Sequence, residues 1–279
     1  MKKLGILLAG ALAVMGWQAP AEAQTAPTST LESVKKAGVL KAGVRKDVAF
    51  FGMANEKGEV EGFDVDIARG IAEKLGVKFE PVIVTSSTRV PLLQQGRIDL
   101  ISATMTQYRS REGAVDFSVG YFFSPQTLLV KKGSGIRGLQ DMADKRAGTA
   151  LGAGAVKNMQ AVQPKVKIQT FQSYPEAFLA LEQGLVDAVG TDITILASLR
   201  ANAKKPGDFE LLKGGVYGGG HYAIALREND SKWRDAVNHA LHDMWNDGTW
   251  KKAYDKWVGP GSKLNIGKDE IDFQMYTWR

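Results

Sequence analysis

The chain has 279 residues, 44% of them hydrophobic and 24% charged, a balance typical of a soluble globular protein. It contains no cysteine, which excludes disulfide bonds, thiol catalysis and thiolate metal sites. The formal net charge is +6, but the basic residues are scattered among acidic ones without a Lys/Arg-rich run, so we expect no nucleic-acid partner.

The N-terminus has the pattern of a secretory signal peptide over 1–23. Lys2 and Lys3 precede a long apolar run, and Ala-Glu-Ala at 21–23 is a small-x-small cleavage site. We expect a leader over 24–37 after cleavage. Position 24 is not the cysteine that a bacterial lipid anchor would need, and no later stretch reaches about 18 consecutive apolar residues. The mature protein is therefore predicted to be soluble and periplasmic.

After the leader, strand and helix patterns alternate. Short apolar or alternating runs predict strands, and apolar residues spaced about every 3.6 positions predict helices, which here end at glycines. The predicted strands are 39–44, 77–84 and 97–105, and the predicted helices are 62–76 and 89–96. This alternation predicts an α/β fold with a mostly parallel sheet.

A second run of the same kind begins at residue 126. The stretches LQQGRIDLISAT at 93–104 and LEQGLVDAVGTD at 181–192 share Leu, Gln, Gly and Asp at matching positions, in the same order of helix, glycine and strand. We therefore predict two similar lobes, joined by crossings that permit hinge closure. Lobe 1 is expected to comprise 30–121 and 223–279, lobe 2 to comprise 126–216, and the crossings to lie at 122–125 and 217–222.

Polar residues stand at the ends of the two equivalent strands. The first strand ends at Ala103, Thr104 and Thr106, and the second ends at Asp192. Ligands of open α/β sheets bind beyond the carboxyl ends of the strands. Small residues admit a ligand, hydroxyl groups form hydrogen bonds, Arg111 can bind a carboxylate and Asp192 can bind an ammonium group. The set suits a zwitterion, although ordinary strand-end residues and surface salt bridges would produce the same pattern.

Several stretches together resemble the polar-amino-acid solute-binding proteins of ABC transporters, family 3. They are the signal peptide, GFDVDIARGIAEKLG, LLQQGRIDL, the R-x-x-x-V-DFS-x-G-Y run at 111–121 and DGTWKKAYDKWVG. The resemblance extends over about 38–259 and implies a two-lobe periplasmic-binding-protein fold of type II, each lobe a mostly parallel sheet flanked by helices. It also implies a protein that delivers a polar amino acid to a membrane permease. We expect a monomer without catalytic activity, cofactor or metal.

The resemblance assigns expected roles to individual residues. Ala103, Thr104, Thr106 and Arg111 fall on positions that hold the α-carboxylate and the backbone amide-side groups of the ligand. Asp192 falls on the position that receives the α-ammonium group.

Two further arginines indicate which kind of ligand side chain the protein binds. Arg45 lies in the first loop, and VTSSTRVPLLQQG at 84–96, which contains Ser86 and Arg89, resembles glutamate/aspartate-binding members. An arginine at each place implies charge-assisted contacts to a second carboxylate, so glutamate or aspartate is the predicted ligand. One departure is ALGAGAV at 150–156, which has no hydroxyl group where acidic-ligand members carry a Thr- and Ser-rich turn. An amide, a keto acid or another dicarboxylate therefore stays open.

Two other functions stay open as well. Some proteins that resemble this family are cyclohexadienyl (prephenate or arogenate) dehydratases with a carboxylic acid in the cleft as general acid, and Asp192 is the candidate here. A ligand sensor that acts through a separate partner is the other. His239 and His242 lie three residues apart near Asp243, but no third ligand is evident, so we expect no metal site.

Overall fold

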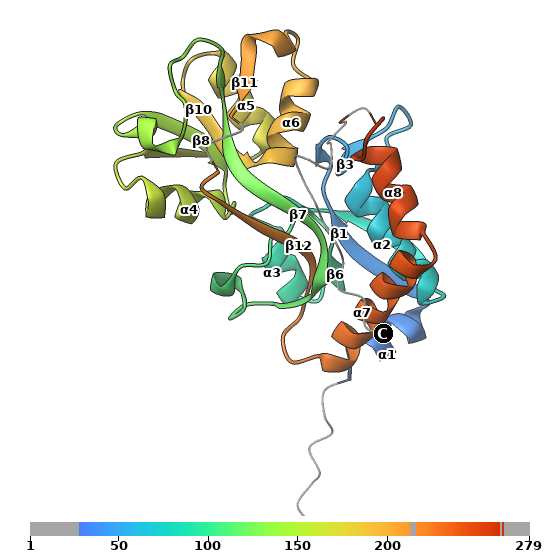
Figure 1. Ribbon diagram of the computed structural model, residues 1–279. Coiled ribbons are helices and arrows are strands. Elements are labelled where there is room, and N and C mark those ends of the chain that lie inside the picture. Colours follow the sequence, from blue (N-terminus) through green and yellow to red (C-terminus); the bar gives the residue numbers. More distant parts are fainter. Residues whose placement is uncertain (1–27, 213–215, 263, 265–279) are drawn as a thin grey trace, which may run out of the picture.

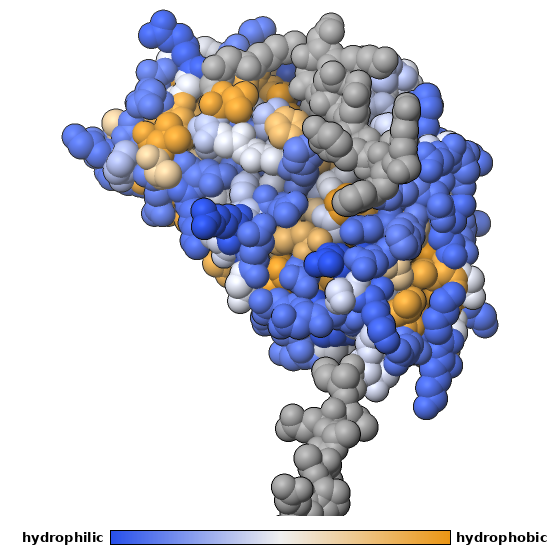
Figure 2. Space-filling view, turned by 60° about the horizontal axis from the view of Figure 1, so that its bottom comes forward, coloured by the Kyte–Doolittle hydropathy of each residue, from blue (hydrophilic) through white to orange (hydrophobic). Residues whose placement is uncertain are grey.

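The computed structural model describes residues 28–212, 216–262 and 264 (Figure 1). The predicted signal peptide, the first residues of the predicted leader and residues 265–279 lie outside this part. Within it, no helix combines the length and the apolar character needed to cross a membrane. The face drawn in Figure 2 is mainly hydrophilic, and its apolar residues form small separate groups.

The elements form two lobes joined by two long strands (Figure 1). The first lobe is built on parallel strands, with β1 between the other two. Its strands are β1 (Val39–Val44), β5 (Lys78–Ile83) and β6 (Leu100–Ile101), and its helices are α1 (Thr30–Ala37), α2 (Phe63–Lys74), α3 (Arg89–Gln94), η1 (Arg109–Arg111), α7 (Ser231–Asn246) and α8 (Thr249–Trp257). The predicted strands 39–44 and 77–84 and helices 62–76 and 89–96 agree with β1, β5, α2 and α3 to within two residues at each end.

The second lobe repeats this plan with strands in the order β10, β8, β9, all parallel. Its strands are β8 (Arg146–Ala150), β9 (Lys167–Phe171), β10 (Ala188–Asp192) and β11 (Phe209–Leu211), and its helices are η2 (Leu139–Met142), α4 (Ala155–Val162), α5 (Tyr174–Glu182), α6 (Ile193–Ala201) and η3 (Pro206–Asp208). In this lobe β10 leads directly into α6, and its last residue is Asp192, one of the predicted site residues.

The lobes are joined by β7 (Asp116–Lys131) and β12 (Gly218–Leu226), which pair antiparallel and make the two sheets continuous (Figure 1). The sequence pattern predicted a new strand at 126. The structure corrects this, because β7 runs through Pro125 as one strand of 16 residues. Proline lacks the N–H that a ladder requires, but Pro125 is accommodated opposite Gly219. The segments predicted as crossings therefore pair with each other inside the two strands.

A small antiparallel sheet extends from the first lobe toward the second. It consists of β2 (Asp47–Val48), β3 (Gly52–Ala54) and β4 (Val60–Glu61). Its first strand lies beside α5 and α6 of the second lobe. The two lobes thus meet face to face.

The core beneath the crossing strands is aromatic. Phe51, Phe63, Phe122 and Tyr222 are buried, and the edge-to-face ring pairs among them have centroids 5.5 to 5.9 Å apart. Such pairs contribute about 0.5–1.5 kcal/mol each beyond the burial of their area. Because Phe122 and Tyr222 belong to the crossing strands, this packing joins those strands to the first lobe.

Candidate functional site

The predicted site residues come together where the lobes meet. Arg45 follows β1, Ala103 and Thr104 follow β6, and Asp192 ends β10. The buried members of the predicted set are Arg45, Ser86, Arg89, Ala103, Thr104, Thr106 and Asp192, while Arg111 is half-buried. Contacts between the lobes enclose the region, and the Arg45 guanidinium lies 5.1 Å from the ring centre of Tyr174 in α5.

Arg111 ends the short helix η1 and turns its side chain toward the second lobe. Its Nη1 donates to the Thr106 carbonyl at 2.7 Å, and its Nη2 lies 3.4 Å from the Gly152 carbonyl of the second lobe. Burial lowers the pKa of Arg111, and Tyr108 and Asp192 offset part of that shift. The neighbouring Arg109 is exposed, so Arg111 is the arginine that can meet a ligand carboxylate.

Asp192 is held in place from both sides. Gln126 Nε2 donates to Oδ1 at 2.8 Å, and the Tyr222 hydroxyl donates to Oδ2 at 2.8 Å. Burial raises the pKa of Asp192, while these two hydrogen bonds and the charges of Arg111 and Arg89 oppose the rise. Each carboxylate oxygen keeps a further lone pair, so Asp192 can still accept a hydrogen bond from an ammonium group.

Arg45 already has a carboxylate partner. Its Nε and Nη2 donate to the two oxygens of Asp47 at 2.8 and 2.7 Å, and its Nη1 donates to Ser86 Oγ at 2.7 Å. Burial alone would lower the pKa of Arg45, but Asp47 and other nearby groups raise it above its usual value. The charge of Arg45 is therefore compensated within the protein.

Arg89 lacks such a partner. Its Nη1 donates to the carbonyls of Ala103 and Thr104 at 2.5 and 3.2 Å, and among the described residues nothing accepts from its buried Nε. The pKa of Arg89 is lowered to about 9. Burial is the largest cause, and the positive charges of Arg111 and Arg45 add to it. An anionic oxygen from a ligand would relieve both the repulsion and the missing hydrogen bond, whereas a neutral carbonyl oxygen would relieve only the missing hydrogen bond.

Thr104 adopts an unusual backbone conformation that ends β6. Its φ is +46°, and its N–H donates to Asp64 Oδ2 at 2.6 Å. Asp64 also accepts from the Tyr121 hydroxyl at 2.7 Å. The predicted strand 97–105 is thus corrected to Leu100–Ile101, because the backbone beyond it leaves the ladder to bond this buried carboxylate.

The turn at 150–156 requires its glycine at Gly152. The φ there is +79°, and a Cβ would lie 2.6 Å from the Ser86 carbonyl oxygen of the other lobe. Only a residue without a side chain allows this approach. The turn at 150–156, which has no hydroxyl groups, therefore lies against the first lobe.

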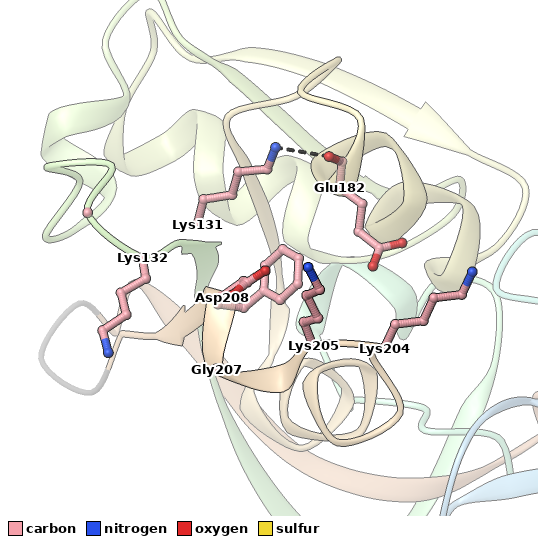
Figure 3. Close-up of a pocket in the computed structure, with 9 residues that line it drawn as sticks. Lys131, Lys132, Glu182, Lys204, Lys205, Gly207 and Asp208 are labelled. Carbon is pink, nitrogen blue, oxygen red and sulfur yellow. Dashed lines mark hydrogen bonds between the residues drawn. The ribbon is translucent and has the colours of Figure 1, made fainter.

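A hollow elsewhere on the second lobe shares no residue with this site (Figure 3). Its volume is ≈ 650 Å³, and its lining residues are Lys131, Lys132, Gly133, Glu182, Lys204, Lys205, Gly207, Asp208 and Phe209. The Lys131 ammonium donates to the Glu182 carbonyl at 2.9 Å (Figure 3). Its four lysines are exposed, whereas most of the predicted site residues between the lobes are buried.

Among the residues that the structure describes, no group of three or more His, Cys, Asp or Glu side chains is placed so that it could hold a metal ion.

A family model described as bacterial extracellular solute-binding proteins, family 3, matches residues 40–260. The chain belongs to this family. The ABC transporter glutamine-binding protein GlnH of Bacillus subtilis is 37% identical over 234 residues, or 82% of this chain and 84% of that protein. The L-glutamate/L-aspartate-binding protein of Pseudomonas aeruginosa is 30% identical over 256 residues, or 86% and 84%.

Solved structures agree with this family membership. An ancestral arginine-binding protein bound to glutamine has a TM-score of 0.75 and 37% identity, with 80% of this chain and 98% of that chain covered. The ancestral amino-acid-binding protein AncCDT-1, a precursor of cyclohexadienyl dehydratase, has a TM-score of 0.75 and 32% identity, with 83% and 100% covered. The predicted α/β, two-lobe fold of type II periplasmic binding proteins is confirmed.

Several residues at the site escaped the sequence reasoning. They are Asp47, Asp64, Tyr108, Gln126, Tyr174 and Tyr222. Asp47 could have been found, because it stands two residues after Arg45 and can turn back to it. Gln126 and Tyr222 lie in the crossing strands, where no local motif indicates a role.

Proposed function

We propose that this family-3 protein binds a polar α-amino acid between its lobes in the periplasm and, as a monomer, delivers it to an ABC-transporter permease. The observation that carries this proposal is the pair of opposite charges supplied by different lobes, with Arg111 half-buried and Asp192 buried. Arg111 would hold the α-carboxylate, with Ala103, Thr104 and Thr106 beside it, and Asp192 would hold the α-ammonium group. Both groups interact by charge in a region removed from water, where such contacts are strong.

The ligand side chain would lie near Arg45, Ser86 and Arg89. Glutamate or aspartate is the ligand predicted from the sequence, and the uncompensated charge of Arg89 supports it. The pairing of Arg45 with Asp47 instead favours a neutral carboxamide, because Arg45 needs no second anion. Glutamine is bound by GlnH, the relative of higher identity. We therefore propose glutamine as the preferred ligand and glutamate as the weaker one.

The first experiment is a thermal-unfolding and calorimetric screen of the purified, ligand-stripped protein against the twenty amino acids. Ligand at a thousand times Kd should stabilise the protein by about 4 kcal/mol. We expect the largest shift with glutamine and a smaller one with glutamate. A protein that no amino acid stabilises would contradict the proposed function.

Asp47→Asn tests the origin of this preference. Without the Asp47 charge, buried Arg45 needs another anion, so the ratio of the Kd for glutamate to that for glutamine should fall about tenfold, equivalent to about 1.4 kcal/mol. The matched control is Asp187→Asn, which breaks a similar two-bond pair with Arg146 in the second lobe. An unchanged ratio in Asp47→Asn would exclude Arg45 as a determinant of the preference.

A dehydratase is the second candidate, because burial raises the pKa of Asp192, as a general acid requires. Incubation with prephenate and arogenate tests it. We expect no turnover, since Asp192 is better explained as the partner of an ammonium group. Turnover by the parent protein that is lost in Asp192→Asn would make the dehydratase the preferred function.

A further inference from the structure

Tyr108 joins the two lobes next to the proposed site, where it contacts Arg111 and Gln126. It lies in the first lobe, between Thr106 and Arg111, and its ring centre is 5.0 Å from the Arg111 guanidinium. Its hydroxyl oxygen accepts from Gln126 Nε2 at 2.9 Å and from Asn158 Nδ2 at 3.2 Å. Gln126 belongs to β7 beyond the crossing, and Asn158 belongs to α4 of the second lobe.

The two amide side chains around this hydroxyl also bond each other and Asp192. The other hydrogen of Gln126 Nε2 is donated to Asp192 Oδ1 at 2.8 Å, and Gln126 Oε1 accepts from Asn158 Nδ2 at 2.8 Å. Tyr108 thereby connects the arginine proposed for the α-carboxylate with the aspartate proposed for the α-ammonium group. The two hydrogen bonds of the Tyr108 hydroxyl cross from one lobe to the other, so they exist only while the lobes are together.

Gly154 makes the space that Tyr108 occupies. A Cβ on Gly154 would lie 2.3 Å from Tyr108 Cε2, closer than real atoms approach. Its backbone, with φ −65° and ψ −21°, is nevertheless helical and suits alanine. The glycine at 154 is therefore required by the neighbouring lobe and not by the turn itself.

We propose that Tyr108 is a positioning residue that fastens the closed cleft, with Gly154 as its receiving surface. The inference rests on the proposed function and deepens it. Because Tyr108 bonds protein groups, it acts on the closed state and not on the choice of ligand. Together with Gly152, which approaches Ser86, this role of Gly154 explains why the 150–156 turn carries two glycines, since a Cβ at either position would hold the lobes apart.

Tyr108→Phe removes the hydroxyl and keeps the ring over Arg111. The loss of two cross-lobe hydrogen bonds should raise Kd on the order of tenfold. Stopped-flow fluorescence should assign this change to faster dissociation, since the lobes reopen more readily. The factor should be the same for glutamine and glutamate. An unchanged Kd, or a change confined to one ligand, would overturn the inference.

Gly154→Ala tests the steric half of the proposal. It should weaken binding at least as much as Tyr108→Phe while leaving the melting temperature of the ligand-free protein unchanged or raised, since alanine stabilises a helical position. Adding Gly154→Ala to Tyr108→Ala should cost no further affinity. Gly207→Ala in the same lobe is the matched control, because its Cβ meets nothing within 4 Å. If Gly154→Ala lowered the affinity equally in the parent and in Tyr108→Ala, the proposed contact between Gly154 and Tyr108 would be contradicted.

A readout without ligand separates this inference from the proposed function. The chain has no cysteine, so spin labels can be attached to cysteines introduced at the exposed positions Glu56 and Lys204, one in each lobe. Double electron–electron resonance should find longer inter-lobe distances in Tyr108→Phe and Gly154→Ala than in the parent. If no amino acid binds the parent, the proposed function fails, and these distances still decide the inference. Identical distances in all three proteins would reject it.

Discussion

Asp64 is a buried carboxylate that the proposed ligand contacts do not include. It accepts from the Thr104 N–H and the Tyr121 hydroxyl, and so holds the backbone of Thr104 in its left-handed conformation. Burial raises the pKa of Asp64 to about 6, although these hydrogen bonds and the charges of Arg45 and Arg89 oppose the shift. The folded protein therefore binds this proton more tightly than the unfolded chain does.

The pH dependence of stability follows from that shift. The stabilising contribution of Asp64 is fully present below about pH 4 and is lost as the pH rises through about 6, by up to about 3 kcal/mol. When urea unfolding is measured from about pH 4 to 7, Asp64→Asn should remove this part of the pH dependence of the free energy of unfolding. Asp235→Asn, at an exposed carboxylate in α7, should keep it. A parent-like slope in Asp64→Asn would show that another group is responsible.

At the scale of elements, β7 and β12 carry the connection between the lobes. Gly219 faces Pro125 in their ladder with φ +123°, and a Cβ there would lie 2.5 Å from Pro125 Cα. Neither the backbone nor the packing can accept a side chain at this point. The close approach lets a proline remain inside a strand that spans both lobes.

Gly219→Ala should therefore destabilise the protein by about 3 kcal/mol, since strain and overpacking each cost about 1–3 kcal/mol. Urea unfolding of the ligand-free protein measures this. Gly113→Ala, whose Cβ meets nothing within 4 Å, should change stability by less than about 0.5 kcal/mol. A similar small effect in both variants would mean that the ladder adjusts around residue 219.

At the scale of the whole molecule, the lobes touch through groups that are polar and specific. Arg45 lies over Tyr174, Gly152 approaches Ser86, and Tyr108 bonds Gln126. In the described part of the chain, β7 and β12 are the strands that run between the lobes. A hinge at 122–125 and 217–222 stays a prediction, with these contacts as the ones that would break on opening.

Small-angle scattering tests the hinge. We expect the ligand-free protein to occupy both open and closed states, and its radius of gyration to decrease on addition of its amino acid, because the ligand shifts the population to the closed state. Arg111→Ala should abolish the decrease by removing the α-carboxylate partner. A radius that does not respond to a ligand bound in calorimetry would contradict hinge closure.

Local patterns predicted much of the fold and the position of the candidate site. The elements of the first lobe follow from apolar periodicity, and the position of Asp192 follows from the end of a buried strand. The same patterns were wrong at 97–105 and at 126. In both places a residue far away in the sequence decides the backbone: Asp64 draws Thr104 out of the ladder, and Gly219 accommodates Pro125.

The sequence by itself determined the fold class, the family and the residue types of the candidate site, because periodicity, glycine ends and strand-end polar residues are local properties of a chain. Tertiary structure alone decided which of these charges are compensated. Arg45 meets Asp47, whereas Arg89 meets only carbonyl groups and other arginines. The strength of a buried charge depends on distances between atoms and on the exclusion of water, and both arise only once the lobes have come together.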